Sequence, residues 1–189
     1  MAPGLMTKPD HPYWRITMTR ITALSLDQAP AASRPLLESV QKGFGFIPNA
    51  ISTLAHSPAA LNGYLALTQA LGKGSLSAAE RETVALATSQ ANGCDYCLAA
   101  HTFFGDKAGL SADDIRSARA GNLNAVAVFA RQVTDNRGQL SDGQLQEARA
   151  AGLTDAKLVE IIAQVTLLTL TNYLNNVAAT EVDFPPVAG

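Results

Sequence analysis

Two cysteines and a histidine lie together within nine residues near the middle of the chain. The stretch GCDYCLAAH, residues 93–101, contains both cysteines of the chain, Cys94 and Cys97, and one of its three histidines, His101. If a helix begins here, the spacing puts both sulfurs on one side and His101 one turn further along the same face. Two neighbouring thiols can form a disulfide, ligate a metal or react with an oxidant. The spacing alone leaves all three open.

The start of a helix favours reactivity of these thiols. Free N–H groups and the positive end of the helix dipole favour thiolate over thiol. A thiolate that reacts with a peroxide becomes a sulfenic acid, which a second thiol converts to a disulfide. The reaction also needs a base within reach. His101 is the local candidate, and Glu82, on the preceding predicted helix, reaches it if the chain turns back at Gly93.

Other interpretations of the cysteine pair have less support. A closed zinc site needs four strong ligands, whereas the chain has no third cysteine, and His11 and His56 lie in unrelated contexts. A structural disulfide here would close a loop of only four residues and add about 2 kcal/mol at best. Buried cysteines can also be plain core. The joint spacing favours a redox pair and predicts no metal and no cofactor.

Helix-start and helix-stop residues recur along the chain. Ser77 with Glu80 forms a capping-box pattern, and Gly93 supplies the stop. Similar signals and apolar periodicity predict helices near 35–42, from 48, from 58, and within 75–93, 94–109, 111–121, 124–138, 142–152 and 153–184. No stretch alternates with period two, so the fold class is predicted to be all-α, a helical bundle.

The chain is expected to form one domain. Residues 1–22 contain three prolines without helical periodicity and predict an N-terminal arm. Residues 23–189 then form a single all-helical domain, with an active half at about 46–121 and a scaffold half at about 122–185.

A weak internal repeat is a further expectation. A shift of 77 residues lays LSAAE (76–80) over LTDAK (153–157). If the two units are related, only the first carries chemistry. The positions of Cys94, Cys97 and His101 then correspond to Thr171, Leu174 and Ala178.

Composition narrows the classes of partner. The chain has 189 residues, 47% hydrophobic and 16% charged, with a net charge of −2. This charge gives no reason to expect nucleic acid or an acidic membrane surface. The apolar run 158–174 contains Glu160, Gln164 and Asn172 and is short for a membrane span, so it predicts a buried helix. No secretory signal is recognisable. We expect a cytoplasmic protein, and the low charge favours a homo-oligomer.

The order Glu82, eleven residues, Cys94, two residues, Cys97, three residues, His101 resembles the E-x11-C-x2-C-x3-H core of the AhpD-like alkylhydroperoxidases. These form the peroxidase-related branch of the carboxymuconolactone decarboxylase superfamily. Residues 45–61 and 171–185 resemble the entry segment and the closing helix of that branch. The resemblance implies an all-helical AhpD-like fold that assembles as trimers or hexamers.

The resemblance also implies roles for the site residues. Cys97 is then the peroxidatic thiol and Cys94 the resolving thiol, while Glu82 and His101 form the proton relay. Tyr96 stands where the best-known member has a histidine; it could donate a hydrogen bond to the site, but its ordinary pKa near ~10 excludes it as a base at neutral pH. The expected partners are a hydroperoxide substrate and a dithiol reductant, such as a lipoyl protein or a thioredoxin-like protein.

Several functions therefore compete. The first is a thiol-dependent peroxidase, and the alternative is a thiol–disulfide adaptor or redox sensor without significant peroxidase activity. Decarboxylase or lactone chemistry and a metal-binding or purely structural module have less support. Five aromatic side chains are expected in the core rather than in a substrate pocket: Phe44, Phe46, Tyr64, Phe103 and Phe104.

Overall fold

The regular secondary structure of the described part of the protein is all α-helical, as the sequence predicts. The computed structural model describes residues 18–185, and this range contains nine α-helices and no strand. The helices are α1 (Arg34–Phe44), α2 (Asn49–Leu54), α3 (Pro58–Leu71), α4 (Ala78–Ala91), α5 (Asp95–Lys107), α6 (Ala112–Ala120), α7 (Ala125–Asp135), α8 (Asp142–Ala150) and α9 (Asp155–Ala178). Most of the predicted N-terminal arm lies outside the described residues.

The helices begin where the capping residues predict. Ser57, Ser77, Ser111 and Thr154 each accept a hydrogen bond from the backbone N–H three residues further along. The capping box predicted at Ser77 is complete, because the Glu80 side chain also accepts the Ser77 N–H. These local bonds satisfy backbone donors that a helix start leaves free.

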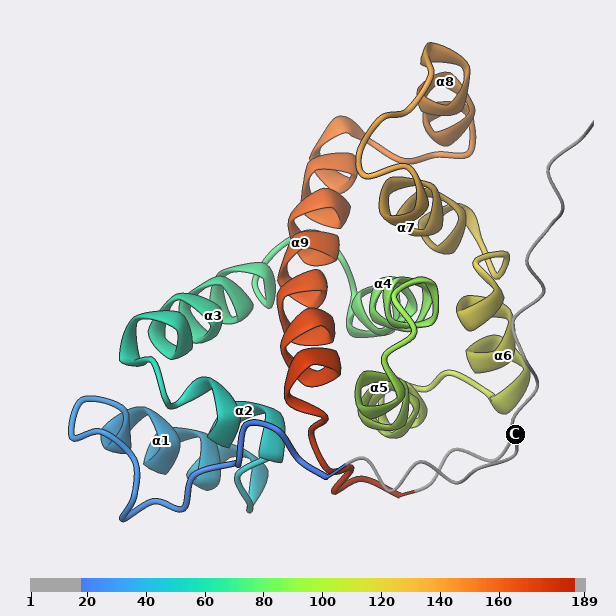
Figure 1. Cartoon of the computed structure of the whole chain (residues 1–189). Coiled ribbons are helices and arrows are strands. Elements are labelled where there is room, and N and C mark those ends of the chain that lie inside the picture. The colour runs from blue at the N-terminus through green and yellow to red at the C-terminus, as the bar shows by residue number, and fades with distance from the viewer. Residues whose placement is uncertain (1–17, 186–189) are drawn as a thin grey trace, which may run out of the picture.

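Helix α9 is the axis of the molecule. In Figure 1 it runs through the middle, with α1, α2 and α3 on one side and α4, α5, α6 and α7 on the other. Leu167 and Leu168 of α9 pack with Ala85 of α4, and Leu174 packs against the core formed by α1 to α3. Helix α4 contacts α5, α6, α7 and α9, and its middle segment is fully buried. The site described below lies where these two groups of helices meet.

The first residues of α4 and α9 are separated by 77 residues, the offset of the predicted repeat. Helix α4 begins at Ala78 and α9 at Asp155. Helix α9 then continues through Leu170, the position that corresponds to Gly93, so it has no turn there. One long helix takes the place of the α4–α5 pair.

Gly93 makes the turn that folds α5 back against α4. Its φ of +61° lies in the left-handed region, which costs a residue without a Cβ little. The Gly93 N–H donates to the Gln90 carbonyl (3.3 Å), and the Cys94 N–H donates to the Ser89 carbonyl (3.0 Å). The turn thus closes α4 and places Cys94 at the start of α5.

Replacing Gly93 with alanine should lower the free energy of unfolding by about 1–2 kcal/mol, because the left-handed conformation strains a residue that has a Cβ. The added Cβ would meet nothing within 4 Å, so the effect isolates backbone strain. Gly63→Ala is the matched control: it lies within α3, also with open space around it, and should raise the free energy by roughly 0.5–1 kcal/mol. Urea unfolding measures both, and a stabilised Gly93→Ala would contradict the prediction.

No helix between residues 18 and 185 combines the length and the apolar character needed to cross a membrane.

Candidate functional site

Both cysteine side chains lie at the start of α5. Cys94 is the N-cap residue, and its Sγ accepts a hydrogen bond from the Cys97 N–H (3.4 Å). Both thiols are free and buried, with exposed fractions of 0% for Cys94 and 3% for Cys97. The structure therefore brings the two sulfurs together on one side of the helix, as the spacing predicts.

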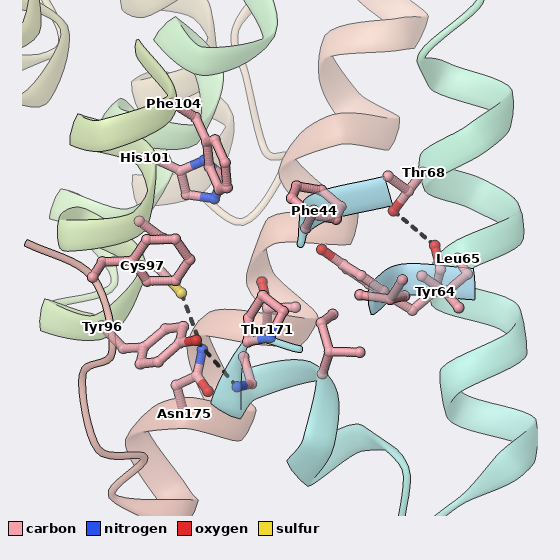
Figure 2. A pocket seen from close by; sticks show the side chains of 16 residues that line it. Phe44, Tyr64, Leu65, Thr68, Tyr96, Cys97, His101, Phe104, Thr171 and Asn175 are labelled. Atoms are coloured by element: carbon pink, nitrogen blue, oxygen red, sulfur yellow. Dashed lines mark hydrogen bonds between the residues drawn. The ribbon is translucent and has the colours of Figure 1, made fainter. Parts of the chain in front are cut away.

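His101 and Glu82 form a pair beside the thiols. The turn at Gly93 lays α5 against α4, and His101 Nδ1 lies 2.8 Å from Glu82 Oε2. Each side chain is 20% exposed. His101 lines the same pocket as Cys97, and Figure 2 shows its ring on the wall that carries the sulfur. All four residues of the predicted motif thus lie at one place.

Helix α9 adds residues that the motif does not contain. Asn175, which is 4% exposed, donates a hydrogen bond from Nδ2 to Cys97 Sγ (3.3 Å). Its neighbour Asn172 is fully buried, accepts from Asn92 Nδ2 (2.8 Å) and donates to Ser89 Oγ (3.2 Å). The second half of the chain, expected to be scaffold, therefore supplies a donor to the thiol.

The surroundings make Cys97 the more acidic of the two thiols. A hydrogen bond from the Cys94 thiol has the largest effect, and the positive charge of His101 and the amides of Asn175 and Asn172 act in the same direction. Together they outweigh burial and hold the pKa of Cys97 well below its ordinary value. Donation to Cys97, together with burial, raises the pKa of Cys94. Of the two thiols, Cys97 is therefore the one that ionises first.

The helix start contributes differently from what the sequence predicts. The backbone N–H of the first turn goes to Cys94 Sγ, whereas the donors to Cys97 Sγ are side chains, the Cys94 thiol and the Asn175 amide of α9. The low pKa of Cys97 therefore comes first from the Cys94 thiol at the helix N-cap, and His101 and the amides of α9 add to it.

His101 carries a proton more readily than a free histidine. Burial lowers its pKa, but the negative charge and hydrogen bond of Glu82, with the charge of Cys97, raise it above the ordinary value. A histidine whose protonated form is favoured in this way can give its proton to a product that forms beside Cys97.

Among the described residues, the Tyr96 hydroxyl makes its hydrogen bonds to Asp183 and Ala50 and none to a sulfur. It donates to Asp183 Oδ1 (2.8 Å) and accepts the Ala50 N–H (3.2 Å). Asp183 also accepts the Asn49 N–H at the start of α2 (2.8 Å). Burial raises the pKa of Tyr96, and Asp183 adds to the increase. Tyr96 thus connects the start of α5, where the cysteines lie, to the segment after α9, and it also lines the pocket.

An apolar pocket of about 120 Å³ opens beside Cys97. Figure 2 shows the thiol of Cys97 and the ring of His101 on one wall and α3 on the opposite wall. This volume is comparable to the ~150 Å³ apolar cavity that accommodates benzene in another protein. Five aromatic side chains line the pocket: Phe44, Tyr64, Tyr96, Phe104 and Phe184.

Three of the aromatic residues expected in the core therefore line the pocket, namely Phe44, Tyr64 and Phe104. Phe44 is 55% exposed and contacts Phe104 edge-to-face, with ring centroids 5.8 Å apart. Phe103 and Phe46 instead pack around Phe184. Hydrophobic periodicity cannot separate a core side chain from a pocket side chain, because both face the interior.

Within residues 18–185, no group of three or more His, Cys, Asp or Glu side chains is arranged to hold a metal ion.

Comparisons with known proteins agree with the all-helical fold. Residues 58–130 match the Carboxymuconolactone decarboxylase family. The chain is similar to the structure of an alkylhydroperoxidase AhpD core, an uncharacterized peroxidase-related protein from Ralstonia eutropha JMP134. The TM-score is 0.77 and the identity 27%, over 87% of this chain and 92% of that chain. No curated protein matches the chain.

Two further solved structures share the fold. A peroxidase-related protein from Silicibacter sp. TM1040 is 24% identical, with a TM-score of 0.71 over 93% of this chain and 94% of that one. The debrominase Bmp8, solved with 2,3,4-tribromopyrrole, is 18% identical, with a TM-score of 0.73 over 88% of this chain and 93% of that one. The same helical fold thus occurs in proteins with different chemistry.

Proposed function

We propose that this chain, an AhpD-like member of the carboxymuconolactone decarboxylase superfamily, is a thiol-dependent peroxidase that reduces hydroperoxides through Cys97 and Cys94. One observation carries the proposal: the acidic thiol of Cys97 lines an apolar pocket, and the Cys94 thiol and the His101–Glu82 pair lie beside it. Such a site gives a small oxidant access to a thiolate and supplies both the resolving thiol and a proton.

The reaction consumes one hydroperoxide and oxidises two thiols. The Cys97 thiolate attacks the O–H oxygen of the peroxide; an S–O bond forms, the O–O bond breaks and an alkoxide leaves. His101 gives its proton to the alkoxide, and Glu82 holds the imidazole in place. Cys94 then attacks the sulfenic acid on Cys97, which forms the disulfide and releases water. A dithiol reductant then reduces the Cys94–Cys97 disulfide to two thiols by thiol–disulfide exchange and is itself oxidised to a disulfide.

Burial of the sulfurs argues against a protein thiol–disulfide adaptor. Exchange requires a thiolate of the partner to reach a sulfur directly. With exposed fractions of 0% and 3%, Cys94 and Cys97 are out of reach of a thiol on a protein surface, whereas a small molecule reaches Cys97 through the pocket. A slender dithiol, such as a lipoyl arm, therefore fits as reductant better than a thioredoxin-like protein does.

Assembly into trimers or hexamers stays a prediction. Its support is a row of exposed apolar side chains at spacings of three, four and eight residues along α9: Val159, Ile162, Leu170, Tyr173 and Val177.

One equivalent of an organic hydroperoxide should convert the reduced protein to the Cys94–Cys97 disulfide. Intact mass, free-thiol titration and peptide mapping before and after the addition measure this conversion. If both thiols stay reduced while the peroxide persists, the proposal is wrong. If oxidised lipoamide forms the disulfide quickly and peroxide acts no faster than on a free thiol, the adaptor is the better description.

A further inference from the structure

One hydroxyl that lines the pocket donates no hydrogen bond of ordinary geometry to another described residue. Thr171 donates to the Leu168 carbonyl (3.0 Å), Thr68 to the Tyr64 carbonyl (2.8 Å) and Tyr96 to Asp183 (2.8 Å). The Tyr64 hydroxyl, in contrast, makes no hydrogen bond of ordinary geometry within residues 18–185; the side chain of Thr68 influences it, but the Thr68 proton goes to the Tyr64 carbonyl. A phenol that lines an apolar pocket without an acceptor is available to a ligand.

The Tyr64 hydroxyl faces the reacting sulfur across the pocket. Figure 2 shows Tyr64 extending from α3 with its oxygen directed toward the wall that carries Cys97 and His101. Burial raises the pKa of Tyr64 to about 12; the charges of Cys97 and Glu82 add to this effect and Thr68 partly opposes it. The hydroxyl therefore stays protonated at physiological pH and can act as a donor.

The charges around the pocket select against an anionic substrate. No Lys or Arg is among its lining residues within 18–185. The groups at its wall that favour a charged form are Cys97, as a thiolate, and His101, whose positive charge when protonated is already paired with Glu82. A carboxylate in this pocket would lose water without gaining a cationic partner, which is costly. An apolar group about the size of one aromatic ring fits the volume of about 120 Å³.

We propose that Tyr64 binds the substrate by donating a hydrogen bond to the peroxide oxygen that leaves, and that the substrate is an uncharged organic hydroperoxide with one ring-sized apolar group. The inference rests on the proposed peroxidase function. As Cys97 takes the O–H oxygen and the O–O bond breaks, negative charge develops on the oxygen bound to carbon. A fixed donor stabilises that charge more than it stabilises the neutral peroxide, so it accelerates the step.

Tyr64→Phe tests the hydrogen bond in a single turnover of the reduced protein. Oxidation of Cys97 by cumene hydroperoxide should slow by about 10- to 100-fold, in line with the loss of one donor to a developing oxyanion. A peroxy acid should show a smaller loss, because its leaving carboxylate needs little stabilisation. Tyr173→Phe is the matched control: Tyr173 lies on α9, is 59% exposed and does not line the pocket, so its rate should equal that of the wild type.

Two readouts separate substrate binding from a structural effect. Oxidation of the thiols by diamide and the pH profile of Cys97 alkylation should be the same in Tyr64→Phe and the wild type. In the wild type, cumene hydroperoxide carrying a para-carboxylate should react at least about tenfold more slowly than cumene hydroperoxide itself.

An unchanged rate in Tyr64→Phe, an equal loss with every peroxide, or equal rates for the charged and uncharged hydroperoxides would overturn this inference while leaving the peroxidase intact. If no hydroperoxide oxidises Cys97 in the wild type, the proposed function itself is wrong, and the inference is wrong with it.

Discussion

Replacing Cys97 with serine should reduce hydroperoxide consumption to the uncatalysed background, because a serine hydroxyl does not ionise at neutral pH and cannot form a sulfenic acid. Cys94→Ser should behave differently. It keeps the Asn175 hydrogen bond and the charge of His101 beside Cys97, so without a reductant it should consume one equivalent of peroxide and then stop with a sulfenic acid at position 97. Peroxide turnover with a dithiol reductant measures the first outcome; peroxide consumption without reductant, followed by trapping of the sulfenic acid with dimedone, measures the second.

The two serine variants are controls for each other, because each replaces one buried thiol by a hydroxyl of similar size. Equal circular-dichroism spectra and thermal midpoints would show that both fold. Full turnover in Cys97→Ser would contradict the proposed role of that thiol. Lactone or halide chemistry that survives alkylation of both cysteines would point instead to a reaction of this fold that does not use the pair.

The part of the site that the sequence predicts is the part built by local geometry. The capping residue Ser77, the stop at Gly93 and the spacing of Cys94, Cys97 and His101 are features of neighbouring residues. Once a helix ends at Gly93 and the next begins at once, the two helices form a hairpin, and Glu82 comes to lie beside His101. Each step needs only capping rules and helix periodicity.

The parts that could not be predicted depend on packing between distant segments. Asn175 follows Cys97 by 78 residues, and no spacing rule relates the two. Asp183 and Phe184 reach the site only because the segment after α9 returns across α5. The sequence did hold one signal, since the asparagines at 172 and 175 interrupt an apolar helix. A buried amide needs a partner, so these residues pointed to polar contacts inside the fold.

Replacing Glu82 with glutamine should slow Cys97 alkylation at pH 7 by about tenfold, as expected when an opposite charge no longer supports an ionised neighbour. The amide keeps the size of the side chain and loses its charge. Burial of His101 then acts without the opposing carboxylate, so the pKa of His101 falls. Neutral His101 no longer favours the Cys97 thiolate, and the pKa of Cys97 rises toward the ~8.5 of a free cysteine.

The direction of the change in the Cys97 pKa distinguishes loss of the Glu82 charge from misfolding of the site. Alkylation increases with pH in both proteins, because only the thiolate reacts, but the midpoint of Glu82→Gln lies at higher pH. Above both midpoints Cys97 is ionised in each protein, so the two rates should converge, which a misfolded site would not produce. Glu147→Gln on α8 removes the same charge outside the site and should leave the profile unchanged. Superimposable profiles for the wild type and Glu82→Gln would mean that the thiolate depends on Cys94 and Asn175 alone, with the His101–Glu82 pair serving only the proton transfer to the leaving oxygen.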